Sequence, residues 1–405
     1  MIKIAVLGYG TVGSGVVEVI QTNHRSINMK ALDEIEIKYV LDLRDFPGDP
    51  VQEKLVHDFD VIEADPEVRI VVETMGGLHP AYEFTKRSLL AGKSVCTSNK
   101  ELVAAYGTEL LQLAKERELN YMFEASCGGG IPIIRPLNSS LTADEIDEIT
   151  GILNGTTNYI LTKMAVDGSD FDEALREAQQ NGYAERNPEA DIEGYDACRK
   201  IAILSSLAYG SHVSYKDIYT EGITKISAVD IKYAQAIGAS IKLLATSRKV
   251  GDEFFAMVSP VMINSSNPLY SVQGVFNAIF IHGNVLGDAM FYGSGAGKLP
   301  TASAVVADVV DCAKHLDRNV RYEWSDQQLE LMPVGRVRNR FFVRVSGTMA
   351  EEMQKIRSVF GEVETISVPG LGGEFAFITE KMPESEFQDA IAQLDGVLST
   401  IRVRF

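Results

Sequence analysis

The 405-residue chain contains only four cysteines, and no two of them form a CxxC pair. Isolated cysteines argue against a disulfide-stabilised scaffold and against a structural zinc site. No apolar run approaches the ~20 residues that a bilayer crossing requires. The first residues also lack the charged start and the long apolar middle of a signal peptide, so we expect a cytoplasmic protein without a membrane partner.

Basic residues are scarce as well. The sequence has 38 Lys and Arg against 56 Asp and Glu, which gives a formal net charge of -18. Nucleic acids are bound mainly by clustered lysines and arginines, so this balance excludes them as expected partners. An acidic chain can still bind an anionic cofactor, provided that backbone amides and local cations do the binding. There is also no repeat long enough to predict a solenoid.

The length predicts two or three domains of roughly 100–200 residues. Residues 1–135 alternate short apolar runs with helical patterns, which is typical of an α/β fold with a doubly wound, Rossmann-type parallel sheet. The expected strands and helices are listed in chain order: strand Ile2–Leu7, a helix after Gly13, strand Ile35–Leu41, strand Val68–Glu73, helix Pro80–Ala91, strand Ser94–Thr97, helix Glu101–Glu118 and strand Asn120–Ala125.

The remainder has a different texture. Residues Ile149–Arg248 suggest long helices, Phe254–Val261 and Gly274–His282 suggest strands, and Thr301–His315 suggests a helix. The tail, 340–405, follows the order strand, helix, strand, strand, helix, strand. We therefore predict a second, α+β domain over 136–320, a nucleotide domain completed by about 297–320, and a small α+β domain over 338–405.

The segment Gly8-Tyr-Gly10-Thr-Val-Gly13 fits the pattern G-x-G-x-x-G and lies between an expected strand and an expected helix. In such a loop the first glycine makes the turn, the second admits a pyrophosphate, and the third lets helix and strand pack closely. The helix N-terminus adds free N–H groups and partial positive charge. We therefore predict a nicotinamide dinucleotide site. Its expected residues in and near this loop are Gly8, Gly10, Thr11, Val12, Gly13 and Arg44.

The end of the second expected strand bears on the choice of dinucleotide. An acidic residue here favours the free ribose of NAD, whereas a nearby arginine favours the 2′-phosphate of NADP. Asp42 and Arg44 are both present. The sequence leaves NADP or NAD open, with a slight preference for NADP because Arg44 can reach a phosphate while Asp42 turns away.

Three polar clusters lie beyond the glycine loop. Thr97–Lys100 ends a parallel strand, where it is either a ligand site or a helix cap with a solvated lysine. Asn154–Tyr159 is either a ligand-approach site or another helix start. Tyr183–Lys200 is an acidic turn leading into a helix on which Asp196 and Lys200 share one face at i, i+4. That pair is either a solvated salt bridge or part of a reaction site.

Together these segments resemble the homoserine dehydrogenases over about residues 1–320. The most specific part is the block from Ala178 to Lys200, which follows A-x-x-x-G-Y-A-x-x-N-P and then D-I-x-G-x-D-x-x-x-K. The resemblance implies reversible, NAD(P)H-dependent reduction of L-aspartate 4-semialdehyde to L-homoserine, in the threonine, methionine and isoleucine branch of amino-acid biosynthesis. Its small-molecule partners are therefore these two compounds.

The resemblance also implies roles for individual residues. Lys200 would donate the proton that an aldehyde oxygen needs during hydride attack. Lys100 would lie beside the nicotinamide, Thr74 would be a further cofactor contact, and the loop ending at Gly297 would close over the cofactor. Asp196 and Asp191 would orient Lys200 and the substrate. The remaining expected substrate contacts are Glu185, which would take the substrate ammonium, and Gly155 and Thr156, which would take its polar end.

Further expectations come from the family alone. A monovalent cation, usually Na⁺, would be held mostly by backbone carbonyls, at Glu124, Cys127, Gly129 and Ile131, since oxygen-rich loops suit hard ions. The assembly would be a homodimer or a homotetramer, paired through the sheet of the middle domain. The tail resembles an ACT regulatory domain, but Phe342-Val-Arg-Val-Ser-Gly-Thr-Met-Ala lacks the acidic-Pro-Gly turn through which such domains usually bind amino acids.

The glycine loop is also compatible with two other functions. An aldehyde dehydrogenase that forms an acid or acyl phosphate needs a cysteine nucleophile with a base at hand. Cys127 is the only candidate, and no histidine partner is evident near it in the sequence. A redox-sensing regulator that binds nicotinamide without turnover would explain the glycine loop. It would not explain the lysine clusters, and it would be expected to have a basic DNA-binding segment.

Overall fold

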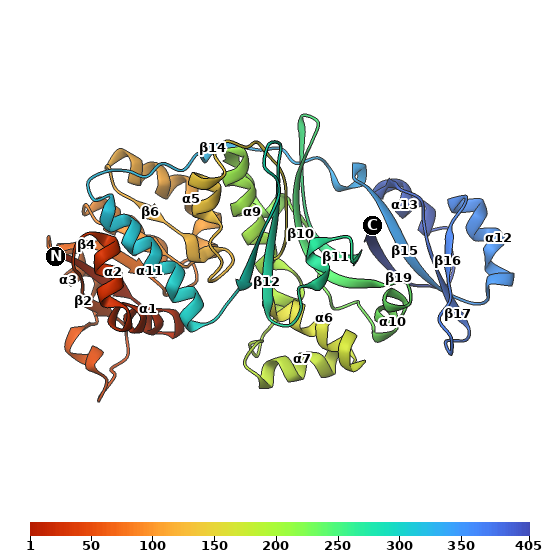
Figure 1. Cartoon of the computed structure of the whole chain (residues 1–405), viewed down its shortest axis with the longest axis horizontal. Helices are drawn as coiled ribbons and strands as arrows, with labels where there is room; N and C mark the ends of the chain where they lie inside the picture. Colours follow the sequence, from red (N-terminus) through yellow and green to blue (C-terminus); the bar gives the residue numbers. More distant parts are fainter. The chain divides into compact units, whose positions relative to one another are not determined.

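The computed structural model describes every residue from Met1 to Phe405 and divides the chain into two compact units (Figure 1). The first unit consists of 1–145, 202–214 and 293–329, and the second of 146–201, 215–292 and 330–405. None of the helices combines the length and the apolar character that a membrane span requires.

The sheet of the first unit is parallel, and its strand order is β3-β2-β1-β4-β5-β6. This is the Rossmann order 3-2-1-4-5-6, in which ligands bind beyond the carboxyl ends of the strands near the reversal between β1 and β4. Its strands are β1 (Ile2–Leu7), β2 (Ile35–Leu41), β3 (Leu55–Val56), β4 (Val68–Glu73), β5 (Ser94–Thr97) and β6 (Tyr121–Met122).

Two groups of helices accompany this sheet. The helices α1 (Thr11–Thr22), α2 (His24–Ala31) and α11 (Lys298–Lys314) pack together, and Val16 and Val305 join a core with Ile4 and Val72 of the strands. The second group is α3 (Phe59–Ala64), α4 (Ala81–Leu90) and α5 (Lys100–Glu116), in which α4 contacts both of the others as well as β4 and β5. The late helix α11 thus completes the nucleotide-binding fold. A short pair, β8 (Ser211–His212) and β14 (Ser325–Gln328), also belongs to this unit.

The second unit is built on one large sheet with the strand order β13-β12-β7-β10-β11-β19-β15-β17-β16. Its longest strands, β10 and β11, form an antiparallel hairpin around Gly251, whose φ of 63° is favourable for glycine. Its strands are β7 (Ile146–Ile152), β9 (Tyr219–Thr220), β10 (Ala239–Val250), β11 (Glu253–Asn264), β12 (Phe276–Gly283), β13 (Gly287–Ser294), β15 (Arg338–Ser346), β16 (Glu364–Ile366), β17 (Glu374–Ile378), β18 (Met382–Pro383) and β19 (Val397–Arg404).

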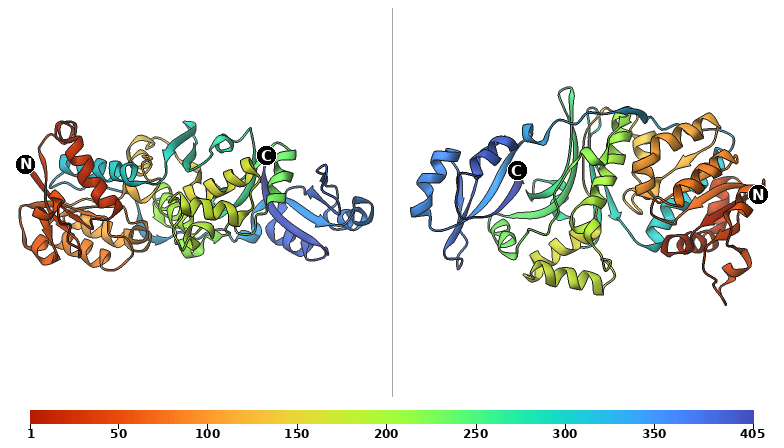
Figure 2. Two further views of the ribbon diagram at one scale, coloured as in Figure 1. Left: turned by 90° about the horizontal axis from the view of Figure 1, so that it is seen from below. Right: turned by 180° about the vertical axis from the view of Figure 1, so that it is seen from behind.

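The helices of the second unit fall into two sets. Near β7 to β12 lie α6 (Gly155–Asp167), α7 (Phe171–Gln180), α8 (Glu189–Ile192) and α10 (Ala228–Ala236), of which α6 contacts β10 and β12. The helix α9 (Tyr195–Tyr209) begins in this unit and ends in the first. In both views of Figure 2 the C-terminal α12 (Met349–Phe360) and α13 (Glu384–Ile391) lie beside the strands of the C-terminal segment. Their side chains pack in a core that includes the stacked rings of Phe341 and Phe387.

The C-terminal segment continues the sheet of the middle segment. The last strand, β19, pairs in parallel with β11, and Val261 lies opposite Arg402. The buried Arg344 of β15 also forms an ion pair with Asp230 of α10, at 3.0 Å between Nε and Oδ1. Within the second unit, the C-terminal segment is therefore joined to the middle segment by backbone pairing and by buried charge.

The predicted fold class is confirmed, and so is the order strand, helix, strand, strand, helix, strand in the tail, to which the structure adds the two-residue β18. The prediction of helices throughout Ile149–Arg248 was wrong at both ends, where β7 and β10 lie. The predicted strand Asn120–Ala125 was too long, because β6 ends at Met122 and a 3-10 turn follows. Most of β10 is buried on both faces, and such a run has no alternating pattern that separates it from a buried helix.

Candidate active site

The glycine loop leaves β1 and enters α1 as the sequence predicts. Gly8 has a φ of 91°, and a Cβ at Gly13 would lie 1.8 Å from the carbonyl oxygen of Gly8. A side chain at position 13 is therefore excluded by the backbone of the same loop. Gly10 is exposed, its Cβ position faces open space, and it precedes the first residue of α1. This arrangement fits a cofactor pyrophosphate, because it combines close backbone approach with free amides at a helix N-terminus.

The two residues that bear on NAD or NADP are in direct contact. Arg44 donates from Nε and from an Nη to the carboxylate of Asp42, at 3.0 Å in each case. Asp42 also accepts the backbone N–H of Tyr9 at 2.8 Å, inside the glycine loop. The arginine holds the pKa of Asp42 well below its usual range. The carboxylate is therefore an ionised anchor for Arg44, and Arg44 itself is exposed.

The segment Thr97–Lys100 lies at the carboxyl edge of the same parallel sheet. Asn99 caps α5, since its side-chain oxygen accepts the N–H of Leu102 at 3.1 Å. Lys100 is the first residue of that helix and is half-buried. The helix-cap interpretation is thus correct for Asn99. It does not compete with a ligand site, because it places Lys100 at the edge where Rossmann folds bind cofactors.

A second polar cluster is built around Lys200 in the second unit. Lys200 Nζ donates to Asp196 Oδ2 at 2.6 Å and to the carbonyl oxygen of Leu153 at 2.7 Å. Asn154 donates from Nδ2 to Asp196 Oδ2 at 2.9 Å and to Asp191 Oδ1 at 2.7 Å. Lys200 and Asp196 are only 8% and 5% exposed. The interpretation as a solvated surface pair is therefore wrong, because this pair is withdrawn from water and held by further hydrogen bonds.

The other expected substrate residues divide into two groups. Gly155 and Thr156 begin α6 directly after Asn154, and a Cβ at Gly155 would lie 2.8 Å from the carbonyl oxygen of Val275. The hydroxyl of Thr156 donates to the carbonyl oxygen of Tyr183 at 2.6 Å. Glu185 is different, because it is exposed, and its backbone carbonyl accepts a hydrogen bond from Gln179. It does not join the hydrogen-bond network of Asn154.

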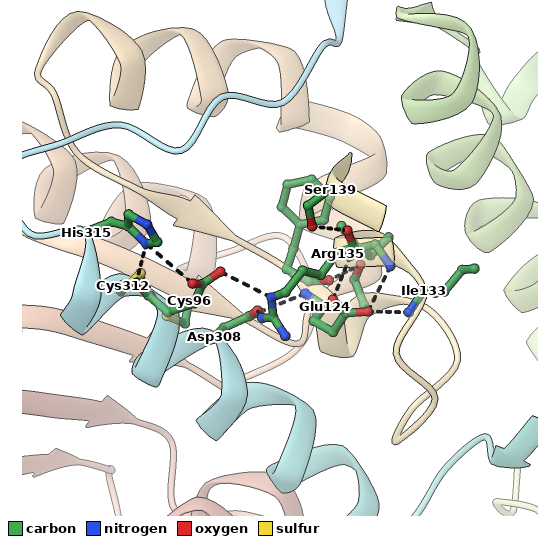
Figure 3. Close-up of polar contacts among 12 residues, drawn as sticks. Cys96, Glu124, Ile133, Arg135, Ser139, Asp308, Cys312 and His315 are labelled. Atoms are coloured by element: carbon green, nitrogen blue, oxygen red, sulfur yellow. Dashed lines mark hydrogen bonds and ion pairs between the residues drawn. The ribbon is translucent and has the colours of Figure 1, made fainter. Parts of the chain in front are cut away.

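The loop expected to hold a cation contains a buried charge network (Figure 3). The carboxylate of Glu124 accepts the N–H groups of Ile133, Ile134 and Arg135 at 2.5 to 2.8 Å. Asp308 of α11 accepts the N–H of Glu124 at 2.8 Å and forms a 2.6 Å ion pair with Arg135. Burial raises the pKa of Asp308 well above its usual range. The Glu124 carboxylate is thus committed to amides, and a cation in this loop would bind carbonyl oxygens instead.

The rest of that loop packs on the second glycine cluster. A Cβ at Gly129, whose φ is 56°, would lie 2.3 Å from the carbonyl oxygen of Gly295. Gly297, with a φ of 117°, precedes the first residue of α11. Cys127 is fully buried, and so is Ile131 apart from 2% of its surface. No group of three or more His, Cys, Asp or Glu side chains is arranged to hold a metal ion.

The structure therefore assembles the expected residues in two places. The first unit contains the glycine loop, Arg44, Lys100 and the Glu124 loop, while the second contains Asp191, Asp196 and Lys200. The sequence interpretation assigned no role to Asn154, although an asparagine before Gly-Thr-Thr is a recognisable helix cap. It also gave no role to Glu73, a buried carboxylic acid whose sequence signal is its position at the end of the mostly apolar strand β4.

Comparisons with known proteins point to one family. A family model described as homoserine dehydrogenase matches residues 132–310. A model described as the NAD binding domain of homoserine dehydrogenase matches residues 8–124. A homoserine dehydrogenase of Synechocystis is 48% identical over 319 residues, which cover 76% of this chain and 73% of the relative. One of Bacillus subtilis is 36% identical over 430 residues and covers 99% and 98% of the two chains.

Solved structures give the same result. A homoserine dehydrogenase from Thiobacillus denitrificans superimposes with a TM-score of 0.92 at 35% identity, over 100% of this chain and 98% of that one. A hyperthermophilic archaeal homoserine dehydrogenase in complex with NADPH superimposes with a TM-score of 0.65 at 30% identity, over 77% and 97% of the two chains.

Proposed function

The chain belongs to the homoserine dehydrogenase family, and from this premise we propose which of its residues carry out the reaction of that family. The enzyme is an NAD(P)-dependent oxidoreductase that interconverts L-aspartate 4-semialdehyde and L-homoserine. The observation that carries the assignment of roles is the buried Lys200, bonded to both Asp196 and the carbonyl of Leu153.

The glycine loop and the N-terminus of α1 are proposed to bind the cofactor pyrophosphate, with Thr11 and Val12 at that N-terminus. When bound, the nicotinamide supplies or takes up the hydride. Thr74 follows β4 and donates from its hydroxyl to the carbonyl oxygens of Leu7 and Gly8, at 2.9 and 3.0 Å. These hydrogen bonds attach Thr74 to the start of the glycine loop.

Lys200 is proposed to move the proton. As the carbon of the aldehyde gains a hydride, its oxygen gains negative charge and must receive a proton from a group within hydrogen-bond reach. The ammonium of Lys200 donates to Asp196 and to the carbonyl oxygen of Leu153, and these two bonds fix the position from which it would give a proton to the substrate oxygen. In the reverse direction the amine accepts the hydroxyl proton of homoserine.

The remaining roles concern orientation. Asp196 fixes Lys200 by direct contact, and Asn154 joins Asp196 to Asp191, which makes Asn154 a positioning residue. Lys100 is proposed to lie beside the reacting carbon. Gly155 and Thr156 at the N-terminus of α6 suit a carboxylate, because amides and partial positive charge gather there.

For the substrate ammonium the structure favours Asp191 over Glu185. Asp191 is already anchored by Asn154 and half-buried, whereas the exposed Glu185 would have to reorient. Glu185 would contact the substrate ammonium only if its loop moved when the substrate binds.

NADP is the proposed cofactor in preference to NAD. The guanidinium of Arg44 is held against Asp42, which leaves the Asp42 carboxylate less able to accept a ribose hydroxyl. A 2′-phosphate would meet the exposed side of Arg44, and paired Arg–phosphate hydrogen bonds are strong.

A monovalent cation is proposed at the backbone carbonyls of Glu124, Cys127, Gly129 and Ile131, since the Glu124 carboxylate is occupied by amides. A homodimer or homotetramer is proposed through the sheet of the second unit. Its outermost strand β13 exposes Met290 and Tyr292, which are apolar side chains that a partner subunit would cover.

The test is an assay with the purified full-length chain, in which homoserine is offered with NADP⁺ or NAD⁺ and the reduced cofactor is measured by absorbance. We expect turnover with both and a higher kcat/KM for NADP⁺. L-serine, which is one methylene shorter, serves as the control substrate and should give no turnover. Equal rates with serine would contradict the assigned substrate site, and a preference for NAD⁺ would contradict the role of Arg44.

A further inference from the structure

Glu73 occupies an unusual place in the first unit. It is the last residue of β4, where it pairs with Leu7 of β1 on one side and with Thr97 of β5 on the other. It therefore lies at the reversal of strand order, beside the glycine loop. Its side chain is fully buried, and burial raises its pKa. A buried carboxyl group costs stability, so its presence needs a structural or functional explanation.

Neutral donors surround the Glu73 carboxyl group. Oε1 accepts the backbone N–H of Met75 at 2.7 Å and that of Gly76 at 3.4 Å. Gly76 and Gly77 both have positive φ, of 78° and 69°. The carboxyl group therefore closes and holds the turn that follows β4, in a conformation that glycine adopts readily.

A second arm runs from Glu73 to the helix that begins with Lys100. The hydroxyl of Thr97 donates to Glu73 Oε2 at 2.5 Å and accepts the backbone N–H of Asn99 at 2.9 Å. Asn99 caps α5 through the N–H of Leu102 and donates to the carbonyl oxygen of Gly77 at 2.5 Å. The hydrogen bonds thus form a closed ring from Glu73 through Thr97 and Asn99 back to the turn after β4.

The same turn is attached to the glycine loop. Thr74, the next residue, donates from its hydroxyl to the carbonyl oxygens of Leu7 and Gly8. A Cβ at Gly13 would lie 2.8 Å from that hydroxyl. Glu73 and Thr74 therefore join two structures that have no sequence connection, the pyrophosphate loop after β1 and the start of α5 after β5.

We infer that Glu73 is a positioning residue for hydride transfer, which fixes Lys100 relative to the bound nicotinamide through Thr97 and Asn99. The inference rests on the proposed role of Lys100. A misplacement of about 1 Å at a reacting centre can cost about 100-fold in rate, so a buried ring that sets this spacing acts mainly on kcat. The hydrogen bonds of Glu73 go to Met75, Gly76 and Thr97 within the protein, so we expect the ring to act little on the binding constants.

The chemistry of the ring explains why a carboxyl group stands here. Three donors converge on one side chain, and a carboxylate offers about four acceptor positions. In Glu73→Gln the amide nitrogen can only donate, so either the turn or the Thr97 hydroxyl loses its acceptor. In Thr97→Val the shape is kept while the hydroxyl, which both donates and accepts within the ring, is removed.

The decisive comparison is Thr97→Val against Thr97→Ser in the full chain, with kcat, KM for homoserine, the dissociation constant of NADPH and the melting temperature measured for each. We expect Thr97→Val to lower kcat by about 10- to 100-fold while both binding constants change less than about 3-fold. Thr97→Ser keeps the hydroxyl and should stay within about 3-fold of the unchanged chain. Thr85→Val is the matched control, since Thr85 is a buried threonine of the same unit whose hydroxyl has no hydrogen-bond partner.

A further readout separates positioning from general loss of folded enzyme. With a cofactor deuterated at the transferred position, the primary isotope effect on kcat should increase in Thr97→Val, because hydride transfer becomes slower relative to product release. If Thr97→Val does not fold, Glu73→Gln replaces it, with an expected fall in kcat of about 5- to 20-fold and the same increase in isotope effect.

The inference is overturned if kcat in the folded variant stays within about 2-fold, or if its loss equals that of Thr85→Val. Lys100→Met distinguishes this failure from a failure of the proposed site. A Lys100→Met variant with full activity removes the assigned role of Lys100, whereas an inactive Lys100→Met beside a fully active Thr97→Val removes only the role of Glu73.

Discussion

Asn154 has two functions in the structure that a single pair of substitutions can separate. Its side-chain oxygen accepts the N–H of Thr157 and caps α6, while its Nδ2 donates to Asp191 and Asp196. Serine is about as good a helix cap as asparagine, whereas alanine is not. Asn154→Ser therefore keeps the cap and removes the donor to the two aspartates, and Asn154→Ala removes both.

The magnitudes follow from these contacts. A hydrogen bond to a charged group contributes about 1.5–3 kcal/mol, and each 1.4 kcal/mol corresponds to about tenfold in rate. If the bond to Asp196 is what orients Lys200 in the transition state, its loss should lower kcat/KM for homoserine by about 10- to 100-fold in both variants. Loss of the cap should lower stability by about 1 kcal/mol in Asn154→Ala alone.

Steady-state kinetics and urea unfolding of the two variants measure these effects separately. The expected pattern is two equally impaired enzymes, of which only Asn154→Ala is less stable. Full activity in Asn154→Ser together with impaired activity in Asn154→Ala would mean that Asn154 acts only as a helix cap. The argument that it positions Asp196 would then be refuted.

Three other predictions concern cofactor choice, pH and stability. Arg44→Gln should raise KM for NADP⁺ about tenfold or more and change KM for NAD⁺ less than about threefold; an equal change in both would contradict a 2′-phosphate contact. Burial lowers the pKa of Lys242 from 10.5 to about 8, so its charged form costs stability below pH 8 and this cost falls as pH rises toward 10.5. Urea unfolding should show that the free energy of unfolding of the unchanged chain rises by about 2 kcal/mol relative to that of Lys242→Met between about pH 6.5 and 9.5. Lys232→Met, at an exposed lysine, serves as the control. If the difference between the unchanged chain and Lys242→Met did not change with pH, the assigned burial cost would be contradicted. Arg344→Met leaves the buried carboxylate of Asp230 without its cationic partner and should lower stability by about 3 kcal/mol or more in the same assay. An unchanged unfolding curve would show that the pair does not join the C-terminal segment to the middle one.

The nucleotide-binding half could be predicted well because its signals are local. The glycine spacing and the apolar strands each depend on a few neighbouring residues, and β1, β2, β4 and β5 lie at their predicted bounds. The first half of the second unit could not be predicted in the same way. Most of the strand β10 is buried on both faces, and its sequence mixes polar with apolar residues, so it has no two-residue period that distinguishes strand from helix.

The candidate site shows the same division. Asp196 and Lys200 were predictable as a pair because i, i+4 spacing places them on one helix face. Their burial was not, since it depends on Leu153 and Asn154 from another segment. The role of Glu73 was equally hidden, because only the order of strands in the sheet brings it beside Thr97.

The most direct test of the assigned reaction site is Lys200→Met, assayed in both directions alongside its NADPH dissociation constant. Methionine keeps much of the length and the apolar stem of the lysine side chain but lacks the ammonium group that donates the proton. We expect kcat to fall by about 1,000-fold or more, since general acid catalysis contributes about 10²–10⁴-fold, with NADPH binding within about threefold of the unchanged chain. A Lys200→Met enzyme that retains more than about a tenth of its kcat would contradict proton transfer by Lys200.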